Sequence, residues 1–80
     1  MERMSARFVG RKLGLSAERV YSIWEGMGLV IKDNFGGWDL TEVGRNIGGR
    51  MSKSNHRPVP TFDFEVVEKM MLDYYNKHRK

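Results

Sequence analysis

The feature that most constrains the fold is the stretch 13–44, in which two helix signals are separated by only a short turn. Gly14 suits the left-handed residue that ends a helix, and Ser16 can cap the start of the next one. The second helix carries its large apolar side chains at positions i, i+3, i+4 and i+7, which are Val20, Ile23, Trp24 and Met27. Because this spacing places them on one face, we expect that face to be buried and the helix to end at Gly28.

A hairpin is predicted directly after this helix. Residues 29–31 are apolar and β-branched, residues 34–37 include residues that tolerate positive φ, and residues 38–40 alternate between apolar and polar side chains. We expect Trp38 of the second strand to meet Trp24 in the core.

Helices are also predicted on both sides of the helix and hairpin just described. Thr41 can cap a third, short helix, and Ser5 can cap a helix that precedes the stretch. Helix, short turn, helix, hairpin and helix is the layout of a winged helix-turn-helix, in which the hairpin is the wing. The sequence therefore predicts this fold for residues 1–50.

Residues 51–61 are predicted to form a linker. The segment is polar and basic, and Pro58 and Pro60 interrupt a regular hydrogen-bonding pattern, which favours a loop or an extended edge segment. The predicted order is helix, helix, strand, strand, helix, loop, helix. We therefore expect a mainly α protein with a small β-hairpin, in the α+β class.

The last region, 62–80, is predicted to be an amphipathic helix that begins after Asp63. Its apolar surface is wider than a single stripe, so we expect it to pack on the domain and also on a partner, such as a second copy in a homodimer. The apolar side chains that lie outside the helix stripes are the partner candidates, and these are Phe8, Val66, Met70 and Leu72.

Composition and motifs exclude several kinds of function. The chain has 80 residues and no cysteine, so we expect one small domain without disulfides or thiolate metal sites. His56 and His78 lack the spacing of a metal site, and no phosphate-binding loop, nucleophile elbow or paired-carboxylate motif is present. We therefore expect neither an enzyme nor a bound cofactor or metal. No apolar run approaches the ~20 residues of a membrane span, and no signal peptide is recognisable, which predicts a cytoplasmic protein without membrane contact.

A net charge of +4 suits a polyanionic partner such as double-stranded DNA. In a helix-turn-helix the N-terminal residues of the second helix meet base edges in the major groove. The base-reading candidates on this helix are Ala17, Glu18, Arg19 and Ser22. Polar and cationic residues elsewhere could contact the phosphate backbone or belong to the wing, and these are Arg7, Arg11, Lys12, Lys32, Asn34, Arg45, Arg50 and Lys53. Ordinary solvated surface explains many of the same charges.

Three short motifs resemble a known family. They are Val9-Gly10-x-x-Leu13-Gly14-Leu15-Ser16, Gly28-Leu29, and Gly37-Trp38-x-Leu40-Thr41-x-x-Gly44. Together they are similar to the winged-helix domain at the C-terminus of phage antirepressors (the KilA-C type) and in small phage and prophage proteins. The resemblance covers about residues 5–50 and implies a phage or prophage protein in a bacterial host cell that binds DNA or controls a repressor. The order of helices and wing also resembles excisionases and MerR-type DNA-binding heads.

Two functions of different classes follow as hypotheses. The first is a small DNA-binding transcriptional regulator, for which an excisionase-like role in recombination is a variant. The second is a protein-interaction module that uses the same fold to bind a phage or host regulatory protein, which the two glutamates on the second helix, Glu18 and Glu25, favour because they would repel phosphates.

Overall fold

The computed structural model describes residues 3–53 and 58–78, which form a small α+β domain with four helices and two antiparallel sheets. In chain order the elements are β1 (Arg3–Ser5), α1 (Ala6–Leu13), α2 (Ala17–Gly26), β2 (Val30–Lys32), β3 (Trp38–Leu40), α3 (Glu42–Asn46), β4 (Arg50–Lys53), β5 (Pro58–Asp63) and α4 (Phe64–His78). The α+β class is confirmed. The predicted order of elements was incomplete, because it lacked β1, β4 and β5.

The predicted linker 51–61 belongs largely to a three-stranded sheet with the order β1-β5-β4. β1 pairs only with residues 61–63 of β5, whereas β4 pairs with residues 58–61. Pro58 and Pro60 lie in the half of β5 that β1 does not reach, so one edge of the strand is unpaired beside both of them. Within sheets proline is tolerated at such an edge, where no ladder hydrogen bond is lost.

The predicted hairpin is present as the β2–β3 ribbon, in which Val30 pairs with Leu40 and Lys32 with Trp38. The Asp33 amide donates to the Gly37 carbonyl at 2.9 Å. One Asp33 carboxylate oxygen also accepts from the Phe35 and Gly37 amides, each at 2.8 Å. These three hydrogen bonds stabilise the conformation of the hairpin turn.

Trp24 occupies the centre of the core and is fully buried. Its indole N–H donates to the sulfur of Met71 at 3.3 Å, and its ring lies edge-on to Phe62 with centroids 4.8 Å apart. The remaining buried apolar residues come from the β2–β3 sheet and from α1, α2, the α2–β2 turn and α4: Ala6, Val9, Val20, Leu29, Val30, Leu40 and Val67. α4 is therefore part of the domain, and Val67 and Met71 on its inner face complete the core.

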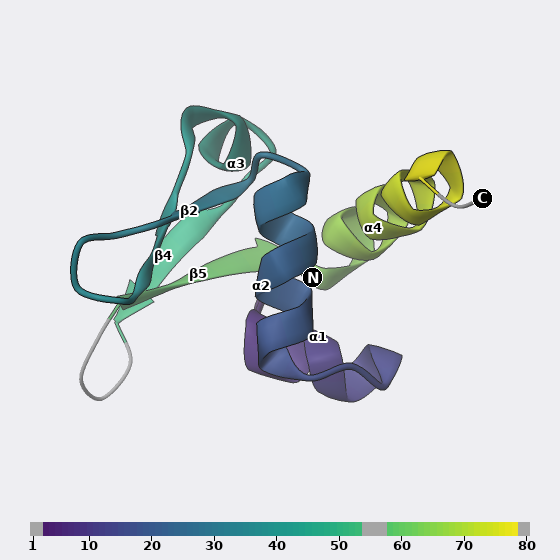
Figure 1. Ribbon diagram of the computed structural model, residues 1–80, viewed down its shortest axis with the longest axis horizontal. Helices are drawn as coiled ribbons and strands as arrows, with labels where there is room; N and C mark the ends of the chain where they lie inside the picture. Colours follow the sequence, from purple (N-terminus) through teal and green to yellow (C-terminus); the bar gives the residue numbers. More distant parts are fainter. Residues whose placement is uncertain (1–2, 54–57, 79–80) are drawn as a thin grey trace.

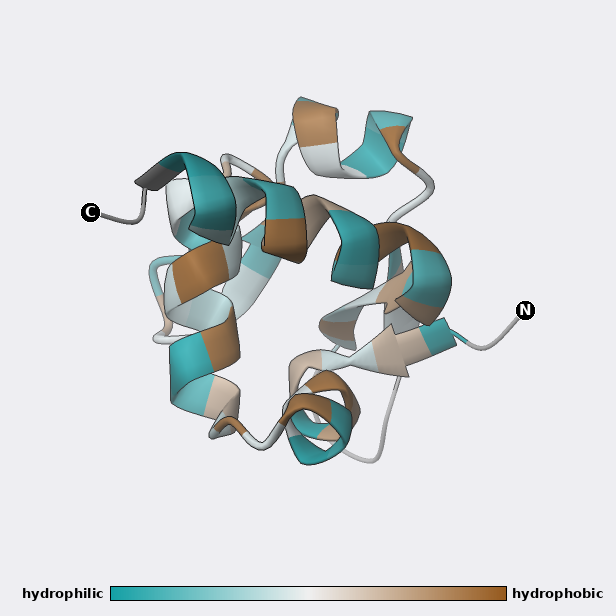
Figure 2. Cartoon of the chain, turned by 90° about the vertical axis from the view of Figure 1, so that its right-hand side faces the viewer, coloured by the Kyte–Doolittle hydropathy of each residue, from teal (hydrophilic) through white to brown (hydrophobic). Residues whose placement is uncertain are grey.

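The elements are spread along the long axis of the molecule (Figure 1). α2 runs through the middle, the β2–β3 hairpin extends to one end beside the β4–β5 sheet, and α4 extends to the opposite end. Figure 2 shows the molecule from the end that carries α4, so that α4 lies towards the viewer, with α2 and α1 beside it. The hairpin and α4 thus flank α2 from two directions.

Candidate functional site

α1 and α2 are joined by a turn of three residues. α1 ends at Gly14, whose φ of 74° is the left-handed conformation that glycine adopts without strain. The Leu15 amide then donates to the Gly10 carbonyl at 2.8 Å, and the Ser16 hydroxyl caps α2 by accepting from the Arg19 amide at 3.1 Å. Ser5 stands at the cap position of α1 as predicted, but its side chain makes no capping hydrogen bond there.

The β2–β3 hairpin is held against α2 by aromatic side chains. The rings of Tyr21 and Trp38 are stacked, with centroids 4.9 Å apart and planes 8° from parallel. Tyr21 also lies edge-on to Trp24, at 5.9 Å and 88°. Trp38 packs against the core cluster that contains Trp24, and Tyr21 contacts both tryptophans, so it fixes the hairpin relative to the helix.

α2 and the hairpin border a shallow hollow of about 400 Å³. It is lined by Glu18, Tyr21, Ser22, Glu25, Lys32, Gly36 and Trp38, and we call it the helix–hairpin hollow. The Lys32 ammonium lies 5.6 Å from the centre of the Trp38 ring, a cation–π arrangement that keeps its charge beside the hollow. The hollow therefore contains two carboxylates and one ammonium.

The predicted base-reading residues separate into two groups. Glu18 and Ser22 are exposed and line the helix–hairpin hollow. Arg19 lies on the other side of α2 and lines a groove of about 470 Å³ against α4, whose lining includes Ile23 and Leu72. Ala17 is half-buried, and its methyl group packs against the core. Only two of the four residues thus share the hollow.

The predicted phosphate contacts are spread over several elements. α1 contains no acidic residue and exposes three of these cations, which are Arg7, Arg11 and Lys12. The Arg11 guanidinium lies 5.8 Å from the centre of the Phe8 ring. The Lys12 ammonium lies 5.1 Å from the centre of the Phe64 ring. The others are exposed on the hairpin, α3 and β4, and these are Lys32, Asn34, Arg45 and Arg50. The Lys53 side chain lies outside the described part of the structure. Of these elements, α1 therefore carries the most predicted phosphate contacts, and no acidic residue of the same helix offsets their charge.

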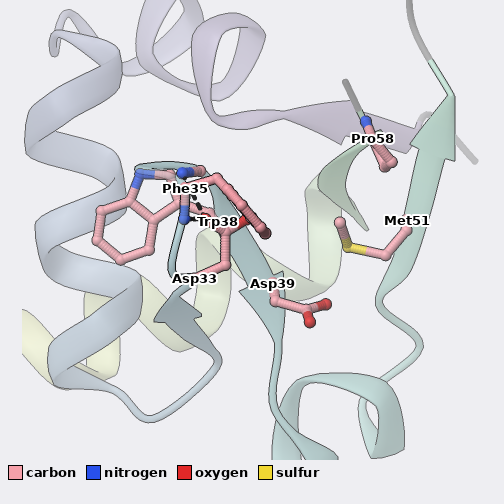
Figure 3. Close-up of a pocket in the computed structure, with 7 residues that line it drawn as sticks. Asp33, Phe35, Trp38, Asp39, Met51 and Pro58 are labelled. Atoms are coloured by element: carbon pink, nitrogen blue, oxygen red, sulfur yellow. Dashed lines mark hydrogen bonds between the residues drawn. The ribbon is translucent and has the colours of Figure 1, made fainter. Parts of the chain in front are cut away.

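The turn of the hairpin faces a second hollow, of about 510 Å³, against the β4–β5 sheet (Figure 3). Its lining includes Asp33, Phe35, Asp39, Met51 and Pro58. Phe35 is 84% exposed, so this ring does not fold back into the core. Sequence reasoning missed this site because one of its walls comes from strands that it did not predict.

The predicted partner residues differ in exposure. Phe8, Val66 and Leu72 are exposed, by 52%, 41% and 59%. Met70 is only partly exposed and packs against the core. Tyr75, which the sequence analysis did not single out, is 60% exposed on the same helix as Leu72.

Burial raises the pKa of the Tyr21 hydroxyl above its usual value of about 10.

Among residues 3–53 and 58–78 no three acidic or histidine side chains are grouped so that they could hold a metal ion, and no helix there has the length and apolarity to cross a membrane. His56 and the side chain of His78 lie outside the described part of the chain.

No protein-family model, curated protein sequence or solved structure matches this chain.

Proposed function

We propose that this chain is a double-stranded DNA-binding regulator, in which α1 and α2 act as a helix-turn-helix and the β2–β3 hairpin acts as its wing. The observation that carries the proposal is the way Tyr21 and Trp38 hold the hairpin beside the solvent-facing side of α2, so that both elements border one hollow. A helix of ten residues whose outer side is exposed can enter a major groove, while the flanking ribbon lies over the backbone.

The charges on α1 and those around the hollow indicate different tasks for the two helices. Arg7 and Arg11 on α1 supply sequence-independent attraction to phosphates, because α1 is the helix that crosses the backbone in this arrangement. Ser22 lies on the outer side of α2 and is small enough to let a base pair approach, and its hydroxyl can donate or accept. Glu18 and Glu25 oppose phosphates, so they weaken binding to DNA of any sequence and increase the relative weight of base contacts.

The first test removes the two carboxylates from the hollow. We expect the double variant Glu18→Gln/Glu25→Gln to bind a random-sequence duplex at least about threefold more tightly than the wild type at low salt, because two charges that repel phosphates are neutralised. The measurement is fluorescence anisotropy of a labelled duplex titrated with protein.

The matched control is Glu42→Gln/Glu68→Gln, which changes the net charge by the same amount on α3 and α4. Both of these side chains are exposed, and neither lines the helix–hairpin hollow. The proposal requires a clearly smaller gain for the control. Equal gains for the two double variants would mean that only the overall charge matters and that DNA does not approach this face.

A protein-interaction module is the second candidate, and the exposed Phe35 ring beside two carboxylates favours it. Asp33 and Asp39 repel phosphates at this end of the hairpin, whereas an aromatic ring with flanking acids suits a basic protein surface. Under this alternative we expect the wild type to bind no DNA. We also expect the immobilised wild type to capture a protein from a nuclease-treated bacterial lysate, and the immobilised Phe35→Ser variant not to capture it. Salt-sensitive DNA binding by both the wild type and Phe35→Ser would exclude it in favour of the first function.

A further inference from the structure

The outer face of α4 carries charges of alternating sign at a spacing of four residues: Glu65, Lys69, Asp73 and Lys77. This spacing places them on neighbouring positions along one side of the helix. All four side chains are exposed, and none of them forms an ion pair with another residue in the ranges 3–53 and 58–78. We call this row the charged stripe.

Apolar side chains lie on the same exposed surface. Leu72 follows Lys69 by three residues, so it lies beside Lys69 on the flank of the charged stripe that borders the groove against α2, and it is 59% exposed. Val66 near the start of the helix is 41% exposed. The opposite face of α4 is occupied, because Val67 and Met71 are buried in the core. The stripe and Leu72 therefore form a surface that the domain itself does not cover.

We propose that a second copy of this chain covers this surface, with the two α4 helices packed antiparallel about a twofold axis near residue 71. In that register Glu65 faces Lys77 of the second copy, and Lys69 faces Asp73 of the second copy, so that each charge in the stripe meets its opposite. The twofold axis repeats both contacts, which gives four ion pairs from one helix surface. A parallel pairing in register places like charges opposite one another.

The apolar residues fit the same geometry. Leu72 lies one residue from the axis along the helix and on one flank of the charged stripe, so the Leu72 side chains of the two copies lie on the same flank of the contact, beside the central Lys69–Asp73 pairs. In the monomer Leu72 is exposed to water, and the four charged side chains have no ion-pair partner among the described residues. In the proposed dimer Leu72 is partly covered and each of the four charges has a partner.

The position of α4 makes this association compatible with the proposed function without depending on it. α4 extends to the end of the molecule opposite the hairpin (Figure 1), so pairing through its outer face leaves the helix–hairpin hollow of each copy uncovered. The test below uses no DNA, and its outcome is therefore separate from the outcome of the DNA-binding tests.

Sedimentation equilibrium over a range of protein concentrations tests the proposal. We expect the wild type to reach the mass of a dimer, and Leu72→Glu to raise the dimer dissociation constant by about tenfold, because two carboxylates then replace the apolar side chains on the same flank of the contact. Circular dichroism establishes that the variant keeps its helices. A wild type that stays monomeric at all concentrations, or a dimer that Leu72→Glu does not weaken, overturns the proposal.

A charge-inverted chain tests the orientation. The variant Glu65→Lys/Lys69→Glu/Asp73→Lys/Lys77→Glu keeps the net charge and the alternation, so we expect it to pair with itself. We expect it not to pair with the wild type, because every antiparallel contact then joins like charges. If inversion at the helix ends disturbs folding, the exchange Lys69→Asp/Asp73→Lys tests the central contacts alone. Free mixing of the wild type with an inverted or exchanged chain contradicts the antiparallel stripe.

Discussion

At the scale of single residues, Tyr21 connects the core to the candidate site. Its ring touches both tryptophans, edge-on to Trp24 and stacked on Trp38. Aromatic pairs of this kind contribute about 0.5–1.5 kcal/mol beyond the burial of their area. The hairpin therefore keeps its place beside α2 through a side chain that is itself half-buried.

Burial of the Tyr21 hydroxyl predicts a pH dependence of stability. Because burial raises the pKa of Tyr21 in the folded state, the unfolded chain loses this proton first as the pH rises. The stability that depends on the neutral hydroxyl is complete below about pH 10, the unfolded pKa, and falls as the pH rises through the folded pKa. We expect Tyr21→Phe to remove this decrease while keeping the stacked ring.

Urea unfolding of the wild type and of Tyr21→Phe, from neutral to strongly alkaline pH, measures this difference. Other tyrosines and lysines titrate in the same range, but they contribute equally to both proteins. Stability curves that stay parallel at all pH values would contradict the assigned burial of the hydroxyl.

At the scale of elements, the contact between α1 and α2 depends on a glycine. A Cβ atom on Gly10 would collide with the backbone carbonyl oxygen of Leu15, which belongs to the turn between the helices. We expect Gly10→Ala to lower the free energy of unfolding by about 1–3 kcal/mol, because the backbone of the turn must shift. Chemical denaturation followed by tryptophan fluorescence measures the loss.

Gly26→Ala is the matched control, because it also replaces a glycine inside a helix. There the nearest atoms to the added Cβ belong to the phenol end of the Tyr74 side chain and not to the backbone, and alanine favours the helix by about 1 kcal/mol. We expect a change close to zero or a small gain. A larger loss for Gly26→Ala than for Gly10→Ala would show that the turn is not tightly packed on α1.

Periodicity and capping residues were sufficient to predict all four helices and the hairpin. The Ser16 and Thr41 hydroxyls accept from the Arg19 and Gly44 amides, at 3.1 Å and 3.0 Å, as expected of helix caps. These signals are local, because each depends on residues within one or two helical turns.

The three-stranded sheet could not be predicted in the same way. β1 pairs with β5, which lies more than fifty residues away in the sequence. β4 has the sequence Arg50-Met51-Ser52-Lys53 and lacks the alternation that indicates a half-buried strand. The prolines of β5 argue against a strand unless the unpaired edge is known. Strands of this kind are determined by tertiary pairing, which leaves little trace in local sequence.

The candidate site was predictable in part for a related reason. Helical spacing correctly indicated an exposed outer face for α2, which includes Glu18 and Ser22. It could not indicate which neighbour borders each edge of that face. The hairpin borders the edge with Glu25, and α4 borders the edge with Arg19, which separates Arg19 from the helix–hairpin hollow.

At the scale of the whole molecule, the two proposed contacts lie apart from each other. The hairpin end borders the face proposed for DNA, and the opposite end carries the charged stripe proposed for a second copy. A dimer would present two such faces related by a twofold axis, an arrangement that suits a palindromic DNA site. Loss of the α4 contact would then weaken DNA binding without changing the face of either copy.

The salt dependence of binding to a random-sequence duplex tests the central claim most directly. We expect the logarithm of the association constant to fall linearly with the logarithm of salt concentration, by about 0.9 for each phosphate that the protein neutralises. Arg7→Gln/Arg11→Gln should reduce this slope by about 2, since both guanidinium groups are proposed to contact phosphates. Absence of binding at micromolar protein and low salt, or an unchanged slope in the double variant, would contradict the account.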